Sequence, residues 1–152
     1  MKGDDLPPDD QIVRYVKPSM IQEDGTPDGT DFRLRHDRPD EVGLSVNWLE
    51  VFGQDKTHQL TEVRRLCRLS LRHAGRFAEM NVGTVKRKVA EELDTLRIVH
   101  DPLEADEKFD ADPSHAEITG LPPSESDLGV LIGDMMAECV IAMHPVNENV
   151  TG

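Results

Sequence analysis

The sequence predicts an α+β fold, a small and mostly antiparallel sheet of about five strands packed against about three to four helices. Short segments with alternating apolar residues, typical of half-buried strands, occur in both halves of the chain. Segments with apolar residues at helical spacing lie between them. The length of 152 residues fits about one domain. These three observations predict one layer of strands covered by helices.

The chain begins with a segment that has little to bury. Residues 1–10 are rich in aspartate and proline, and we expect a flexible acidic arm there. A single α+β domain is expected over residues 11–145, followed by a polar tail over residues 146–152. The first strand of the domain is expected over residues 11–17, where Pro18 ends the alternating pattern.

Turn residues follow this strand, with two glycines and a proline between residues 23 and 29. A second alternating segment, residues 30–37, predicts a strand that pairs with the first as a hairpin with a long loop. Residues 44–52 then have apolar side chains at helical spacing. They predict a short helix that Trp48 anchors and Gly53 ends.

Residues 55–74 show the clearest helical pattern. Asp55 or Thr57 can cap its start, and Gly75 is expected to end it. Apolar and small residues form one stripe at three- and four-residue steps: Leu60, Val63, Leu66, Cys67, Ser70, Leu71 and Ala74.

The next segments predict a strand–helix–strand unit. An apolar segment over residues 76–82 indicates a strand, residues 84–95 indicate a helix capped by Thr84, and residues 96–100 indicate a further strand. An acidic, proline-containing loop over residues 101–114 follows, and it is longer than most ordered connections.

A last strand is expected over residues 115–122, followed by a closing helix over residues 124–143. This helix begins with Ser124 and Asp127 in the manner of a capping box. Its apolar residues cover more than one face, so we expect it to be largely buried.

Two glycines in the closing helix, Gly129 and Gly133, lie four residues apart. Small residues at this spacing permit the close approach of a neighbour. The expected neighbour is the helix of residues 58–74, or the same helix in a second copy of the chain, which would form a homodimer.

The net charge of −13 is unevenly distributed. Residues 101–152 hold one basic and twelve acidic side chains, whereas residues 46–100 hold ten basic and seven acidic ones. Such a field repels phosphate backbones and attracts basic surfaces, so nucleic acid is a disfavoured partner and a basic protein a favoured one. An acidic surface that only keeps the protein soluble explains the same charge.

The chain has no apolar segment long enough to cross a bilayer and no signal-peptide pattern at its start. We therefore expect no membrane-spanning segment and no membrane partner. Cys67 and Cys139 are far apart in helical patterns. They are expected to be reduced, as in a cytoplasmic protein.

His115 stands next to Ser114 at the start of a predicted strand. The side chains of adjacent strand residues point to opposite faces, so these two cannot act as nucleophile and base. Ser114 would need a base from elsewhere in the fold. The pattern therefore favours the ordinary start of a strand over a chemical site.

Neither a metal site nor a cofactor is predicted. The six histidines and two cysteines show no Cys-x-x-Cys, no HExxH and no histidine pair at i and i+4. The dipeptides His36-Asp37 and His100-Asp101 stand at strand ends and could meet around a divalent ion, although no local spacing requires it. Asn81 to Lys88 resembles an anion-binding helix start, but it has one glycine where a phosphate-binding loop needs two.

A set of arginines is the one basic feature of this acidic chain: Arg64, Arg65, Arg68, Arg72 and Arg76. It could hold a phosphate or an acidic segment of a partner. It could equally receive the chain's own acidic loop, or remain solvated, and a charge run favours these latter interpretations.

Two functions remain open. The first, which the sequence favours, is a non-catalytic binding or accessory protein that engages a basic protein partner or acts as a subunit of a larger bacterial-type assembly. Its binding residues would be Glu104, Asp106, Glu107, Asp110, Asp112, Arg64 and Arg68. A nucleic-acid binder that uses the arginine set is disfavoured by the global charge.

The second is a small enzyme that acts on an anionic, phosphate- or nucleotide-containing substrate through an Arg/His cleft. The cleft would be built from Arg14, His36, Arg72 and His115. Either histidine would be the general base, and the arginines would hold the negative charge.

Overall fold

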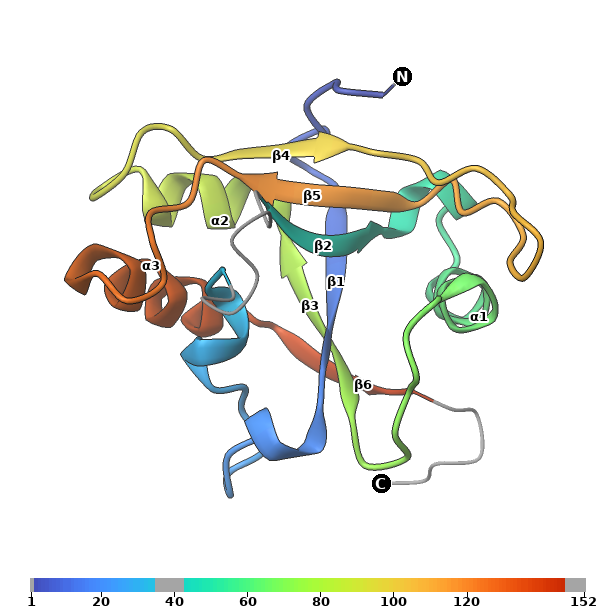
Figure 1. The fold of residues 1–152 in the computed structure, drawn as a ribbon, viewed down its shortest axis with the longest axis horizontal. Coiled ribbons are helices and arrows are strands. Elements are labelled where there is room, and N and C mark those ends of the chain that lie inside the picture. The colour runs from blue at the N-terminus through green and yellow to red at the C-terminus, as the bar shows by residue number, and fades with distance from the viewer. Residues whose placement is uncertain (1, 35–42, 147–152) are drawn as a thin grey trace.

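The computed structural model describes residues 2–34 and 43–146. It confirms the α+β class, with a six-stranded antiparallel sheet and three α-helices (Figure 1). The strands are β1 (Gln11–Val16), β2 (Gly43–Trp48), β3 (Arg76–Asn81), β4 (Arg97–His100), β5 (His115–Thr119) and β6 (Ala142–Pro145). Their order in the sheet is β4-β5-β2-β1-β3-β6. The helices are α1 (Lys56–Leu66), α2 (Val82–Val89) and α3 (Asp127–Glu138), with short 3₁₀ helices η1 (Pro18–Met20), η2 (Gly29–Phe32) and η3 (Leu49–Phe52).

Helices cover both faces of the strongly twisted sheet (Figure 1). Alternate residues of the strands, such as Ile12 and Met80, form the larger core with α2, α3 and η2. Residues of the opposite parity, such as Val13 and Phe77, form a smaller core with α1, where Val63 is fully buried. Among the described residues, no helix has the length and apolar content that crossing a bilayer requires.

The N-terminal segment lies along β4, in contrast to the flexible arm that we expected. The Gly3 amide donates to the His100 carbonyl oxygen at 2.7 Å, and the Leu6 amide to that of Ile98 at 3.0 Å. Leu6 is only 4% exposed and joins the larger core. Its burial explains why this segment packs on the sheet.

The predicted hairpin of residues 11–17 and 30–37 is wrong. β1 pairs with β2 and β3, and the described part of the second segment includes η2. The Asp28 side chain caps η2 by accepting from the Thr30 amide at 2.8 Å, and Phe32 is fully buried. The rest of the predicted strand, residues 35–37, lies outside the described residues.

The predicted helix over residues 44–52 is a strand followed by the 3₁₀ helix η3. β2 pairs with β5 from Gly43 to Asn47, and this long-range pairing overrides the helical spacing. Trp48 ends the strand, and its indole Nε1 donates to the Asp10 carboxylate at 2.9 Å. Gly53 ends η3 with a φ of 94°, a conformation that favours glycine.

α1 begins where the sequence predicts, with the Asp55 carboxylate accepting from the His58 amide at 2.9 Å. It ends at Leu66 rather than near Gly75, because Cys67 adopts an extended backbone. α2 is also shorter than predicted and is capped by Asn81 rather than Thr84. Its flanking strands β3 and β4 form as expected, but they are not neighbours in the sheet.

α3 is capped by Ser126 and ends at Glu138. Residues 142 and 143, predicted as the end of this helix, instead belong to β6, which pairs with β3. Gly133 packs against η2, because a Cβ at this position would lie 2.7 Å from the Gly29 carbonyl oxygen. The close neighbour of this glycine is therefore η2 and not the helix that we expected.

Candidate functional site

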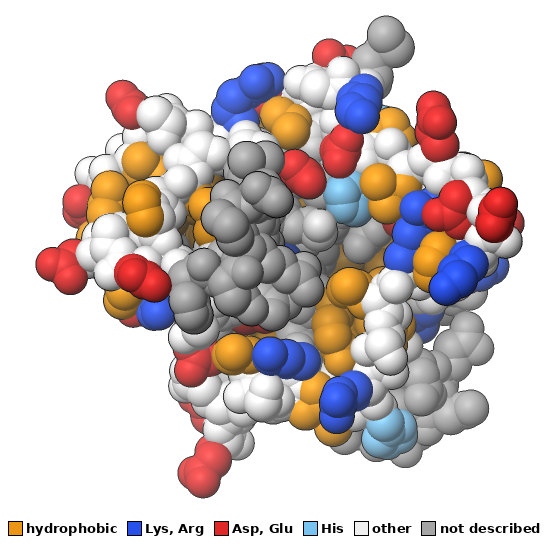
Figure 2. Space-filling view, viewed as in Figure 1, with side chains coloured by type: hydrophobic (Ala, Val, Ile, Leu, Met, Phe, Trp, Pro, Cys, Tyr) orange, Lys and Arg blue, Asp and Glu red, His pale blue; other side chains and the backbone are white. Residues whose placement is uncertain are grey.

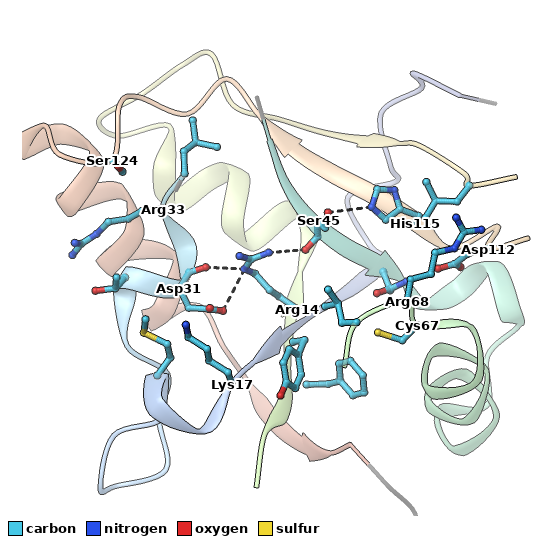
Figure 3. A pocket seen from close by; sticks show the side chains of 18 of the residues that line it. Arg14, Lys17, Asp31, Arg33, Ser45, Cys67, Arg68, Asp112, His115 and Ser124 are labelled. Atoms are coloured by element: carbon cyan, nitrogen blue, oxygen red, sulfur yellow. Dashed lines mark hydrogen bonds and ion pairs between the residues drawn. The ribbon is translucent and has the colours of Figure 1, made fainter. Parts of the chain in front are cut away.

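The sheet opens between its two central strands. β1 and β2 pair only through Ile12–Val13 and Asn47–Trp48, and beyond this point β2 stays with β5 while β1 stays with β3. A pocket of about 820 Å³ lies at this opening (Figure 3). Its volume is that of a site for a small organic molecule.

The pocket combines an apolar lining with an excess of positive charge. Its apolar and aromatic residues are Tyr15, Met20, Leu34, Cys67, Leu69, Phe77, Leu103 and Val130. Its cationic residues are Arg14, Lys17, Arg33 and Arg68, and its acidic residues are Asp31, Asp112 and Glu125. Figure 2 shows a hollow on this face that hydrophobic side chains border. A cationic excess is notable in a chain of net charge −13.

Arg14 spans the opening (Figure 3). Its Nε donates to the Asp31 carbonyl oxygen at 2.8 Å, and its Nη1 donates to the Ser45 carbonyl oxygen at 2.8 Å. The guanidinium thus takes the place of ladder hydrogen bonds where the strands separate. The guanidinium has five N–H donors in all, and these two contacts use one donor on Nε and one on Nη1.

Asp31 lies directly beside Arg14 in the pocket lining, with its carboxylate 3.4 Å from Nε. Burial raises the pKa of Asp31, and the positive charges of Arg14 and Lys17 oppose the rise. One carboxylate oxygen is buried and accepts no hydrogen bond from the described residues. The ion pair with Arg14 is therefore the main compensation for this buried charge.

His115 lies at the start of β5 and makes contacts through both ring nitrogens. Nδ1 is 2.8 Å from the Asp101 carbonyl oxygen and 3.3 Å from the Asp101 carboxylate. Nε2 is 3.2 Å from the Ser45 hydroxyl oxygen. A carbonyl oxygen can only accept, so Nδ1 carries a proton, and in the neutral imidazole Nε2 then accepts from the serine hydroxyl. This tautomer is the one that a general base at Nε2 requires.

Asp101, His115 and Glu117 also offer ligand atoms within 4.8 Å of one another. A carboxylate–imidazole set of this kind suits a divalent cation. The Asp101 in it belongs to one of the two His-Asp dipeptides that the sequence pointed to. The other dipeptide, His36-Asp37, lies outside the described residues.

The structure brings two of the four predicted catalytic candidates together. Arg14 and His115 line the same pocket, and both contact Ser45. Arg72 is exposed and does not line it, although its backbone amide donates to the Tyr15 hydroxyl at 3.0 Å. His36 lies outside the described residues.

The acidic loop folds back onto arginines in the last turn of α1 and directly after it. Arg68 Nη2 donates to the carbonyl oxygens of Glu104, at 2.7 Å, and Asp110, at 3.1 Å. The guanidinium also lies 5.3 Å from the centre of the Phe109 ring. Arg65 Nη1 is 3.4 Å from the Asp110 carboxylate. Basic and acidic side chains accordingly meet at the right of Figure 2. The prediction that the arginines receive the chain's own loop is confirmed for these two.

The predicted binding residues divide into two groups. Glu104, Asp106, Glu107 and Asp110 are exposed on the loop. Asp112 is buried and accepts from the Ser114 amide and hydroxyl, so it cannot present charge to a partner. Arg64 donates to the Pro145 carbonyl oxygen at 2.9 Å and thereby holds β6.

Sequence reasoning missed Ser45 and the role of Asp101. The segment that holds Ser45 was predicted as a helix, which hid the contact of its side chain with His115 on the neighbouring strand. The alternation of Leu44 and Val46 with Ser45 was the available signal for a strand. Comparisons with known proteins find no matching family model, no similar curated protein and no similar solved structure.

Proposed function

We propose that the protein is a small enzyme that acts on an anionic substrate in the pocket at the sheet opening, with His115 as its general base. This is the second of the two functions that the sequence left open. The observation that carries the proposal is the convergence of Arg14 and His115 on Ser45 inside one pocket. Titratable groups that converge in a concave site are the usual sign of chemistry.

The lining indicates the kind of substrate. Arg14 and Lys17 supply positive charge, and a guanidinium or an ammonium group can bind a carboxylate or phosphate oxygen. Apolar side chains such as Leu69 and Phe77 lie in the same pocket. A small organic anion with an apolar portion matches both features.

The orientation of His115 supports its role as a base. Its side chain is 13% exposed, and the Asp101 carbonyl oxygen fixes the ring with Nε2 toward the pocket side of β2. A fixed imidazole whose Nε2 lone pair already faces a serine hydroxyl needs no reorganisation before it accepts that proton.

Binding of small anions tests the proposal. We expect calorimetric titration with phenyl phosphate and with aromatic carboxylates to give saturable binding to the wild type. Lys17→Gln, an exposed change that should not disturb the fold, should weaken this binding several-fold. The matched control Arg87→Gln removes an exposed charge on α2, outside the pocket, and should leave the affinity unchanged. Equal weakening by both variants, or no binding to the wild type, contradicts the proposal.

A second function, the accessory protein that binds a basic partner, is supported by the exposure of four acidic side chains on the loop. The test is capture of partners at low salt by the wild type and by a variant with Glu104→Gln, Asp106→Asn, Glu107→Gln and Asp110→Asn. A partner that the wild type retains and the variant loses supports this function. Identical capture by both proteins counts against it.

A further inference from the structure

We propose that Ser45 is the nucleophile of this pocket, and that Ser45, His115 and Asp101 form a serine-hydrolase type of site for esters of small organic acids that also carry an anionic group. This inference rests on the enzyme function proposed above and names its reaction. It differs from the expectation drawn from the sequence, in which Ser114 was the serine considered.

The three residues form a continuous chain of polar contacts (Figure 3 shows the first of them). The Ser45 hydroxyl lies 3.2 Å from His115 Nε2, and His115 Nδ1 lies 2.8 Å from the carbonyl oxygen and 3.3 Å from the carboxylate of Asp101. A serine, a base and an acidic group that orients the base are the parts of a catalytic triad, which is recognised by this geometry and not by sequence order.

The sheet topology produces the arrangement. His115 pairs with Asn47, so Ser45 stands two residues along β2 on the same face of the sheet. Asp101 directly follows β4, the strand on the other side of β5. Strands β2 and β5 therefore carry Ser45 and His115, and the Asp101 amide donates to the His115 carbonyl oxygen at 2.9 Å just beyond the end of β4. Elements of regular structure hold the first two side chains more rigidly than loops would.

The three side chains differ in their exposure to solvent, and the nucleophile is the one that a substrate can reach. Ser45 is exposed and lines the pocket, so a substrate can reach its hydroxyl. His115 and Asp101 have side chains that are only 13% and 25% exposed. Partial burial strengthens the hydrogen bonds between them.

A thiol in the same pocket, Cys67, is a weaker candidate. Burial raises the pKa of Cys67, and the carboxylate of Asp112 raises it further, so little thiolate exists at neutral pH. The structure places no histidine against it among the described contacts. Ser45 is the hydroxyl that contacts a base.

The reaction has two balanced steps. The Ser45 oxygen attacks the ester carbonyl carbon while its proton passes to His115 Nε2, and the C–O bond to the alcohol then breaks as the alcohol takes that proton. Water attacks the resulting acyl-serine, gives its proton through His115 to Ser45, and releases the carboxylic acid. The Arg14 guanidinium, held beside Ser45 by the bond to its carbonyl oxygen, places positive charge near the developing oxyanion.

Asp101 acts as a positioning residue. Its carbonyl oxygen holds the His115 proton on Nδ1, and its carboxylate stabilises the imidazolium that forms during the reaction. Asp101→Asn keeps the carbonyl oxygen and removes the negative charge. We expect it to slow the reaction of Ser45 and to shift the pH dependence of that reaction, which a purely structural role would leave unmoved.

A fluorophosphonate probe tests the assignment on the full chain, with mass spectrometry to locate the modified residue. We expect one label on Ser45 of the wild type, and none on Ser45→Ala. His115→Asn retains a donor toward Asp101 but has no base, so labelling should slow by about 100-fold. Ser19→Ala, an exposed serine of η1 outside the pocket, is the control and should label like the wild type.

The outcomes separate this inference from the proposed function. If the folded wild type binds organic anions but Ser45 is not labelled, the assignment of Ser45 as the nucleophile is wrong, while the proposed anion site is still supported. Labelling of a different residue overturns it as well. Labelling that needs added Zn²⁺ and stops with a chelator contradicts the triad and favours a cation on Asp101, His115 and Glu117. If Ser45 is labelled but no anion binds, the assignment of Ser45 as the nucleophile is supported, and the proposal of an anionic substrate is contradicted.

Discussion

Glu79 on β3 has three hydrogen-bond partners from three other elements. Its carboxylate, 6% exposed, accepts from Gln11 Nε2 at 2.8 Å, from Lys56 Nζ at 2.7 Å and from His144 Nε2 at 2.7 Å. Burial by itself would raise the pKa of Glu79. The hydrogen bonds from these partners outweigh burial and lower the pKa to about 2.

The usual pKa of a glutamate is 4.5, and folding lowers that of Glu79. The ionised Glu79 therefore stabilises the folded protein at pH values above 4.5, and this stabilisation is lost as the pH falls toward about 2. Glu79→Gln should therefore reduce the free energy of unfolding by about 2 kcal/mol at neutral pH and by much less near pH 2.5. Urea unfolding at several pH values measures this. Glu91→Gln, an exposed position after α2, should show neither effect. A Glu79→Gln penalty that does not change with pH would contradict the linkage.

Single residues of the site were only partly predictable. His115 and Arg14 stand out in the sequence because their side chains suit chemistry and lie in short strands. Ser45 contacts His115 across 70 residues, and only the pairing register of β2 and β5 reveals that contact. Asp112 appears in the sequence as one more acidic loop residue, and its burial under Ser114 depends on the folded loop.

At the scale of elements, α3 and η2 touch through glycine. A Cβ on Gly133 would lie 2.7 Å from the Gly29 carbonyl oxygen and 2.9 Å from Cγ of Arg33. Gly133→Ala should force the two elements apart and cost about 2 kcal/mol of stability. Leu131→Ala, on the exposed side of the same helix, should cost much less. Thermal unfolding of both variants measures the difference, and equal midpoints would show that the close approach is unimportant.

The loop between β4 and β5 depends on Arg68, which donates to two of its carbonyl oxygens. Arg68→Gln should raise the rate of hydrogen exchange over residues 103–112 by about fivefold, the effect of losing about 1 kcal/mol of local stability. Arg65→Gln removes a more exposed contact and should have a smaller effect. Unchanged exchange in Arg68→Gln would mean that the loop is held by other contacts.

The predicted element boundaries were wrong where pairing with a distant strand determines the local structure. Residues 44–48 fit both helical spacing and strand alternation, and pairing with β5 selects the strand. Residues 142 and 143 look like the end of an apolar helix, yet they belong to β6, which pairs with β3 at the edge of the sheet. Elements with a local signal, such as the Asp55 cap of α1, were predicted correctly at that end.

For the whole molecule, the sequence predicts the α+β class, because strand and helix patterns are local. It does not reveal the pocket. The opening between β1 and β2 exists because their registers with β3 and β5 diverge, which no local pattern encodes. The net charge of −13 also gives no indication of the pocket, because the pocket is lined by more cationic than acidic side chains.

That contrast has a kinetic consequence. The overall negative field slows the approach of an anion, and salt screens this repulsion over about 8 Å at physiological ionic strength. The association rate of phenyl phosphate should therefore rise a few-fold between low and physiological salt. Stopped-flow measurements at several salt concentrations test this, and a rate that falls steadily with salt would show that attraction by the pocket dominates at long range.

The central claim is that a small organic anion binds between β1 and β2 beside Arg14 and His115. NMR titration of the labelled protein with phenyl phosphate tests it most directly, through the Arg14 Nε and His115 ring resonances. The account predicts saturable shifts of both side chains and of the Ser45 amide, with little change over residues 104–110. Shifts confined to that loop, or none at all, would contradict it.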